Sequence, residues 1–135
     1  MKIKLLAFSV GTILLLTTAS AFAHHSFAAE YDAKKPVTLT GTVTKVEWMN
    51  PHIFFYVDVK DSDGKVTNWR GEGGNLSGLM RRGWRKDSLK VGDVVTIEGS
   101  LAKNGQPLVN ARTVTLADGK KLFAGSSGGD DYSER

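Results

Sequence analysis

Three histidines are the residues of this sequence best suited to metal chemistry. His24 and His25 stand side by side in AFAHHSF, and His52 follows in WMNPHIFF. If the mature chain begins at His24, its α-amine and its imidazole Nδ1 can chelate one metal ion, since an α-amine with a pKa of about 7.7–8.0 loses its proton to a metal near neutral pH. A further imidazole, from His25 or His52, completes the tetragonal nitrogen set that copper(II) prefers. The sequence therefore predicts copper or a similar divalent ion here, with a structural or incidental role of the histidines as the alternative.

The second imidazole has two candidate sources at different distances along the chain. His52 follows the first predicted strand, whose dozen residues from Val37 span about 40 Å at ~3.3 Å per residue. A segment leading from His24 to Pro36 would have to run back almost fully extended to reach His52. The spacing therefore favours the pairing of His24 with His25.

The N-terminal position of His24 depends on an export signal predicted over residues 1–23. MKIK supplies positive charge, LLAFSVGTILLL an apolar core, and SAFA a small-residue cleavage site that ends at Ala23. The apolar run is shorter than the ~20 residues of a transmembrane helix. We therefore expect a periplasmic protein without a stable membrane anchor after cleavage, if the source is a Gram-negative bacterium. Cleavage after Ala28 or Ala29 would instead remove both neighbouring histidines.

Cysteine content and charge narrow the function further. The chain contains no cysteine, which excludes a disulfide framework and thiolate metal sites. The formal charge of +4 includes two signal-peptide lysines, Lys2 and Lys4, and falls to +2 without them. So small a positive charge argues against nucleic acid as a partner.

Two further clusters carry candidate binding residues. In RGEGGN, the residues Glu72, Gly73 and Gly74 precede a predicted helix and resemble an anion cradle, with a flexible turn as the alternative. Glu72 is also a candidate carboxylate ligand, against an exposed or capping role.

The second cluster is RRGWRK, in which arginines surround a tryptophan: Arg81, Arg82, Trp84 and Arg85. It suits an anionic surface on a periplasmic protein partner, whereas the alternative is a solvated helix face with Trp84 filling the core. No serine–histidine–acid arrangement is persuasive, so we expect a binding protein rather than an enzyme.

The elements that position these residues are predicted from hydrophobic periodicity. Val37, Leu39, Gly41 and Val43 alternate with threonines, and the apolar phase then slips, which predicts a β-bulge near Lys45. Four more strands and one helix capped by Asn75 follow. The predicted strands cover residues 37–48, 52–60, 65–73 and 107–117, with the fourth strand following a turn within 88–100, and the helix lies within 73–84.

This order predicts an all-β fold, a five-stranded OB-like barrel with one short helix between strands 3 and 4. The predicted organisation is a signal peptide (1–23), an N-terminal lead-in (24–36), the barrel domain (37–118) and a disordered tail (119–135).

Four segments of the chain carry a family resemblance: AHHSF, GTVTKVEWMNPH, NWRGEGGN and LKVGDVVTIEG. They resemble a family of small exported proteobacterial proteins that is catalogued as a domain of unknown function. The resemblance extends over residues 24 to about 118, and the chain is also similar to bacterial periplasmic OB-fold proteins. It implies export and an OB-like barrel, and it brings no activity.

Two functions of different classes remain as hypotheses. The first is a small periplasmic protein that binds copper through the histidines. The second is an interaction module or adaptor for another exported protein. A copper oxidase is disfavoured because neither an axial tyrosine nor a flat aromatic binding face can be assigned from the sequence.

Overall fold

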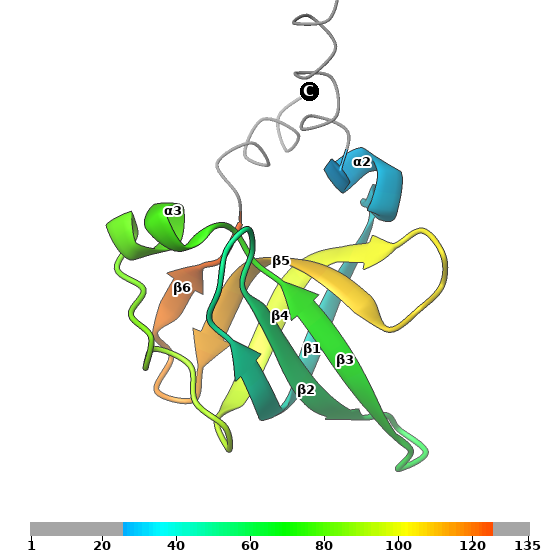
Figure 1. Ribbon diagram of the computed structural model, residues 1–135. Helices are drawn as coiled ribbons and strands as arrows, with labels where there is room; N and C mark the ends of the chain where they lie inside the picture. The colour runs from blue at the N-terminus through cyan, green and yellow to red at the C-terminus, as the bar shows by residue number, and fades with distance from the viewer. Residues whose placement is uncertain (1–25, 126–135) are drawn as a thin grey trace, which may run out of the picture. The chain divides into compact units, whose positions relative to one another are not determined.

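The computed structural model describes residues 26–125 (Figure 1). The chain divides into two compact units, Met1–Glu30 and Tyr31–Arg135. In the first unit, the described element is the short helix α2 (Ser26–Glu30). In the second, the described residues form a six-stranded sheet and the helix α3 (Leu76–Arg81), so the fold is mainly β. No helix in residues 26–125 is long and apolar enough to cross a membrane.

The six strands pair in the order β3-β2-β1-β4-β5-β6, and neighbours in this order are antiparallel. β3 also pairs with β5, in parallel, from Arg70 opposite Leu108 to Glu72 opposite Asn110. The pairings therefore join five strands into a closed series, β1-β2-β3-β5-β4. The strands are β1 (Tyr31–Glu47), β2 (Phe54–Lys60), β3 (Val66–Glu72), β4 (Val94–Ala102), β5 (Leu108–Leu116) and β6 (Lys121–Phe123).

β1 follows the alternation that its sequence predicts. Leu39 and Val43 are buried, whereas the threonines between them face solvent. The register with β2 shifts between Val43 and Lys45, which confirms the predicted bulge and returns Val46 to the packed side. The bulge explains how one strand keeps an apolar face through an odd step in its pattern.

β2 and β3 form a hairpin, and the inward-facing residues of β2 and of the segment just before it reach the core. Ile53, Phe55 and Val57 are each 0% exposed. Gly64 turns the chain with a φ of 84°, a conformation that side chains disfavour. Gly71 lies against the Phe55 ring, because a Cβ at this position would stand 2.5 Å from Phe55 Cε2. The glycine thus allows an aromatic ring to pack directly on the backbone of β3.

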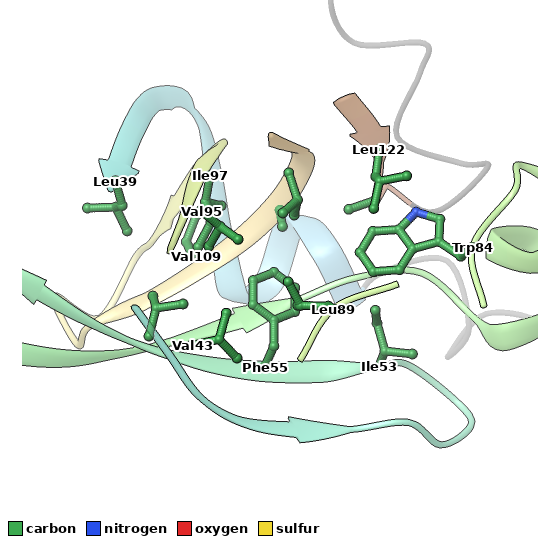
Figure 2. Close-up of a cluster of buried hydrophobic side chains, with 14 of the residues drawn as sticks. Leu39, Val43, Ile53, Phe55, Trp84, Leu89, Val95, Ile97, Val109 and Leu122 are labelled. Carbon is green, nitrogen blue, oxygen red and sulfur yellow. The ribbon is translucent and has the colours of Figure 1, made fainter. Parts of the chain in front are cut away.

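The core also receives side chains from outside the closed series of five strands, β1-β2-β3-β5-β4 (Figure 2). Trp84 and Leu89 enter from the segment that follows α3, and Leu122 enters from β6. The Trp84 indole N–H donates to the Phe123 carbonyl at 2.8 Å, and its ring stacks on Trp48 with centroids 6.5 Å apart. A single tryptophan therefore ties the loop after α3 to β6 and to the end of β1.

α3 begins where the sequence predicts. The Asn75 side chain accepts a hydrogen bond from the Gly78 N–H at 2.8 Å, which confirms the predicted N-cap. Leu79 is the buried residue of this short helix, and Gly83, with a φ of 95°, lies just beyond its end. This short capped helix between β3 and β4 therefore contributes Leu79 to the core.

Two boundaries differ from the sequence-based expectation. β1 begins at Tyr31, inside the predicted lead-in 24–36, where Tyr31 pairs with Ala102 before the register shifts ahead of Pro36. The prediction of disorder from residue 119 is wrong for residues 119–125, because β6 pairs with β5 and Leu122 is 4% exposed. A three-residue strand with one buried leucine is too short to leave a periodic pattern. The rest of the predicted tail, 126–135, lies outside the described residues.

Candidate functional site

Glu72 is a buried carboxylate with a partner on each oxygen. Its side chain ends β3 and the residue is 8% exposed. Oε1 lies 2.5 Å from His52 Nδ1, and the Tyr31 hydroxyl donates to Oε2 at 2.5 Å. Because a buried carboxylate is costly without hydrogen bonds, these contacts explain how Glu72 is tolerated there. We call these residues the His52–Glu72–Tyr31 cluster.

The cluster is assembled from three distant parts of the sequence. Glu72 pairs with Phe54 across the β2–β3 hairpin, which places it beside the start of β2, where His52 lies. Two backbone hydrogen bonds hold this junction, from Ile53 N–H to Gly74 O at 3.1 Å and from Gly73 N–H to Ile53 O at 2.9 Å. Register within one hairpin therefore brings the carboxylate to the imidazole.

Tyr31 reaches the same carboxylate from the opposite direction around the paired strands. It pairs with Ala102 at the end of β4, β4 pairs with β5, and β5 pairs with β3 at Glu72. The closed series of strands thus brings Tyr31, the first residue of β1, to Glu72. The other partner of Glu72, His52, lies beyond the opposite end of β1. His52 does lie beyond the far end of a long strand, as expected, but Tyr31 and His52 still meet at one carboxylate because the pairing of β3 with β5 closes the series of strands.

His52 is held by one ring nitrogen. Its side chain is 33% exposed, and within residues 26–125 Nδ1 is the nitrogen that has a hydrogen-bond partner. Metal-binding histidines are commonly oriented in this way, with one nitrogen on a carboxylate and the other on the metal. No group of three or more histidine, aspartate or glutamate side chains in the described part of the chain gathers around a metal position. His52 is therefore a single candidate ligand, and His24 and His25 lie outside the described residues.

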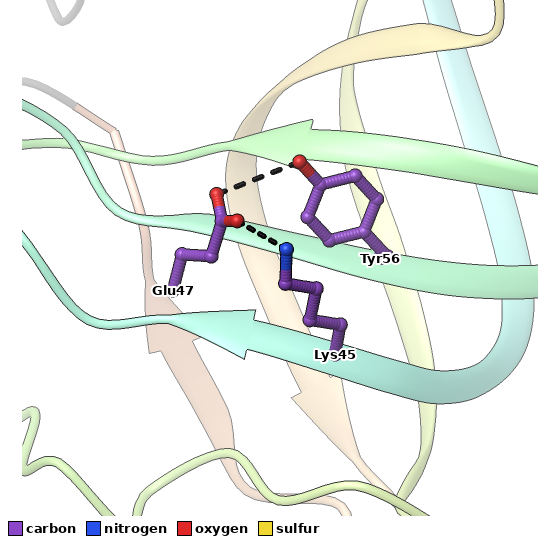
Figure 3. A network of polar contacts seen from close by, with 3 residues as sticks. All are labelled: Lys45, Glu47 and Tyr56. Carbon is purple, nitrogen blue, oxygen red and sulfur yellow. Dashed lines mark hydrogen bonds and ion pairs between the residues drawn. The ribbon is translucent and has the colours of Figure 1, made fainter.

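A second polar group lies near the bulge of β1 and involves Lys45, Glu47 and Tyr56 (Figure 3). Lys45 Nζ lies 2.5 Å from Glu47 Oε1 and 5.2 Å from the centre of the Tyr56 ring. The Tyr56 hydroxyl contacts Glu47 Oε2 at 3.5 Å. The hydrogen bond to Glu47 and its negative charge raise the pKa of Lys45 above the ordinary value of 10.5. This group is open to solvent at Lys45, in contrast to the buried Glu72.

The glycines that follow Glu72 form a turn rather than an anion cradle. The Gly73 N–H donates to Ile53 O at 2.9 Å, and the Gly74 N–H donates to Ala124 O at 2.8 Å. A Cβ on Gly73 would stand 2.8 Å from Ile53 Cγ1. Since both N–H groups already have carbonyl partners, the structure favours the alternative of a close-packed turn, and it gives Glu72 a buried role that the sequence did not predict.

The predicted partner-binding cluster divides between surface and core. Trp84 is 1% exposed, so it packs inside as the alternative interpretation holds. Arg81, Arg82 and Arg85 are exposed. Arg82 lies 4.3 Å from the centre of the Phe123 ring and donates to Gly125 O, and Arg85 donates to Trp84 O. Two of the arginines therefore also hold the loop around Trp84.

Tyr31 is the member of the cluster that the sequence did not indicate. It stands in the stretch SFAAEYDAKK, where no alternation marks it as buried, yet it is 2% exposed. Its partner is separated from it by 41 positions in the sequence. No local pattern in the chain records such a contact.

The comparisons with known proteins place the chain in one group. A family model described as a family of unknown function (DUF6152) matches residues 12–109. This range includes His52, Glu72 and Tyr31. No curated protein matches the chain.

Proposed function

We propose a function for this chain, which belongs to the DUF6152 family of unknown function, from the chemistry of His52. It is a small exported protein that binds copper or a similar divalent metal ion. His52 supplies Nε2 as a ligand, and the mature N-terminus supplies the others. The observation that carries the proposal is the contact of 2.5 Å between His52 Nδ1 and Glu72 Oε1.

The hydrogen bond to Glu72 prepares His52 for a metal in three ways. It places the proton on Nδ1, which leaves the Nε2 lone pair free to coordinate. It makes the imidazole a better electron donor to the metal, because the carboxylate partly accepts that proton. It also fixes the ring plane, and Tyr31 in turn fixes the carboxylate through the second oxygen. A histidine held in this way loses little freedom when a metal binds.

The remaining ligands are assigned from the sequence. After cleavage at Ala23, His24 offers an α-amine and an imidazole, and His25 offers a second imidazole. Nitrogen ligands without thiolates suit copper(II), zinc and nickel, and a planar set suits copper(II) best. Export to the periplasm follows from the predicted signal over residues 1–23. Both His24 and the export signal lie outside the described residues, so their part in this proposal depends on the sequence.

We also propose that the closed series of strands is an OB-like barrel. The pairing of β3 with β5 and the position of α3 between β3 and β4 support this assignment. OB barrels serve many ligands, so the fold is compatible with a binding protein and does not select the ligand.

The experiment is a copper(II) titration of protein that carries its native mature N-terminus, with electron paramagnetic resonance to count nitrogen ligands. Mass spectrometry of the exported protein first establishes that His24 is the terminus. Binding should weaken strongly in His52→Gln and when one residue is added before His24. Glu72→Gln should weaken binding by about 10–100-fold, as expected for a residue that orients a ligand.

Glu98→Gln is the matched control for the charge change, because Glu98 is a carboxylate on β4 whose side chain is 38% exposed and whose partner is Lys121 at 3.4 Å. It should bind copper as the unmodified protein does. Equal binding by His52→Gln, or by the protein with an added N-terminal residue, would overturn the proposed ligand set.

An interaction module is the second candidate, and the exposed arginines favour it. Arg81, Arg82 and Arg85 are exposed next to Met80, which is 49% exposed on α3. An acidic surface on another exported protein would complement them. Arg81 is the arginine to change, because Arg82 and Arg85 also make the loop contacts described above. Charge reversal at Arg81 should reduce capture of a periplasmic partner, and unchanged capture would count against this surface.

A further inference from the structure

Arg70 carries a positive charge with no counter-ion among the described residues. It takes part in no ion pair within residues 26–125. Its Nε is buried and has no hydrogen-bond partner there. The guanidinium carbon lies 5.1 Å from the centre of the Phe54 ring, a cation–π contact that supplies no hydrogen-bond acceptor to Nε. Such a group calls for an explanation, since buried polar atoms in folded proteins are nearly always hydrogen-bonded.

The surroundings of Arg70 form an aromatic face on β2. Arg70 pairs with Tyr56, and Phe54 alternates onto the same side of the sheet as Tyr56. Both rings are half-buried, and each has a cation beside it, Arg70 at Phe54 and Lys45 at Tyr56. Lys45 is neutralised by Glu47, whereas Arg70 is not. Arg70 is therefore a positive charge without an ion pair in residues 26–125, and it lies beside two half-buried aromatic rings.

We propose that Arg70 binds the carboxylate of a small organic acid whose apolar body lies against Phe54 and Tyr56. The planar guanidinium fork matches a carboxylate with two parallel hydrogen bonds. Because Nε is desolvated by burial, the charge of Arg70 is poorly screened and attracts an anion more strongly than a fully hydrated arginine does.

The charge of the neighbourhood selects a monoanion. Glu72 pairs with Phe54 and lies on the same side of the sheet, two positions along β3 from Arg70. Glu47 pairs with Phe54 from β1. These two carboxylates repel a doubly charged group such as phosphate more than they repel one carboxylate. The site therefore takes a singly charged acid with an apolar or aromatic body.

This inference is independent of the proposed metal site. The ligand contacts Arg70, Phe54 and Tyr56, and none of these is a proposed metal ligand. The two proposals can be separated in one experiment, because a chelator removes the metal and leaves the organic acid. His52→Gln should bind the acid as the unmodified protein does.

The test is a titration followed by two-dimensional ¹H–¹⁵N NMR in the presence of EDTA, with the arginine Nε–H signals included. Sodium benzoate is the probe, and benzamide is its neutral counterpart of the same shape. Inorganic phosphate is the comparison, in a buffer alkaline enough for its doubly charged form to predominate. Benzoate should shift the Arg70 Nε–H and the Phe54 and Tyr56 amides along one saturable curve. Benzamide and phosphate should each bind at least about tenfold more weakly, as expected for loss of a charged hydrogen-bonded pair.

Three variants complete the test. Arg70→Gln should lower benzoate affinity at least about tenfold, and Arg70→Lys, which keeps the charge without the fork, should lower it as well. Arg112→Gln is the matched control, an exposed arginine on β5, and should bind normally. Backbone spectra establish whether each variant is folded. If Arg70→Gln is not folded, Arg70→Lys provides the test. Unchanged affinity in folded Arg70→Gln or Arg70→Lys, equal binding of benzamide, or tighter binding of phosphate would overturn the proposal.

Discussion

Replacement of Tyr31 by phenylalanine removes one hydroxyl group and keeps the ring, so it isolates the hydrogen bond from Tyr31 to Glu72. The bond is 2.5 Å long and the tyrosine is 2% exposed. A hydrogen bond to a charged group contributes about 1.5–3 kcal/mol to stability. Glu72 keeps His52 as its other partner in this variant, so the carboxylate is not left without a hydrogen bond. We therefore expect the free energy of unfolding to fall by the lower part of that range, about 1.5–2 kcal/mol.

The assay is urea unfolding at neutral pH, followed by tryptophan fluorescence and analysed by linear extrapolation. Tyr56→Phe is the matched control, because its hydroxyl contacts Glu47 at 3.5 Å and the side chain is half-buried. A bond this long and exposed to water should contribute little, less than about 0.5 kcal/mol. If Tyr31→Phe costs no more than Tyr56→Phe, the hydroxyl does not stabilise the buried carboxylate and the reasoning about the cluster fails.

The same variant also tests how the start of β1 is held. Tyr31 pairs with Ala102, and the register then shifts before Pro36. The hydrogen bond from Tyr31 to Glu72 therefore helps to hold this end of the strand. Amide hydrogen exchange at Ala102 should accelerate in Tyr31→Phe before exchange in the middle of β4 does. Uniform acceleration through β4 would indicate global rather than local loss of stability.

Three further substitutions test the packing and the surface charge. Gly71→Ala should lower stability by about 2 kcal/mol or more in the same urea assay, because its Cβ would stand 2.5 Å from the buried ring of Phe55; a neutral result would contradict that packing. Trp84→Phe removes the donor to a backbone carbonyl and leaves a void in the core, so the free energy of unfolding, measured by thermal unfolding, should fall by about 2–4 kcal/mol. A smaller loss than in a control variant at an exposed site would refute the central position of Trp84 in the core. Lys45→Met addresses pH: the hydrogen bond and charge of Glu47 raise the pKa of Lys45 above 10.5, so the pair stabilises the protein below that pH and ceases to do so as rising pH removes the proton. The stability difference between Lys45→Met and the unmodified protein should therefore shrink in alkaline solution, and a difference that grows with pH would show the sign to be wrong.

The features predicted correctly from the sequence are those encoded within a few neighbouring residues. The alternation in HIFFYVDVK identifies the buried face of β2, and the phase slip near Lys45 identifies the bulge. Asn75 before an apolar turn identifies the start of α3. Each of these signals is local because strand faces, bulges and caps depend on periods of two to four residues.

The features that the sequence did not reveal depend on contacts between distant residues. Tyr31 and Glu72 are 41 positions apart, and β6 is held by one buried leucine against a neighbouring strand. Glu72 itself was recognised as a candidate, but for a carboxylate ligand or a capping role, whereas the structure surrounds it with hydrogen-bond partners. The local pattern of RGEGGN identifies a turn, and it carries no record of which side chains approach from other strands.

The parallel pairing of β3 with β5 is the step that makes the cluster possible. It covers Arg70 to Glu72 opposite Leu108 to Asn110 and is the parallel pairing among the described strands. Without it, the sheet would remain open. The start of β1 and the residues before β2 would then lie apart, at opposite ends of β1. With it, Glu72 occupies the junction at which the series of strands closes, and it receives Tyr31 from one side and His52 from the other. The same junction that completes the fold therefore orients the histidine, so changes that loosen the β3–β5 pairing act on His52 through Glu72 even where they touch neither residue.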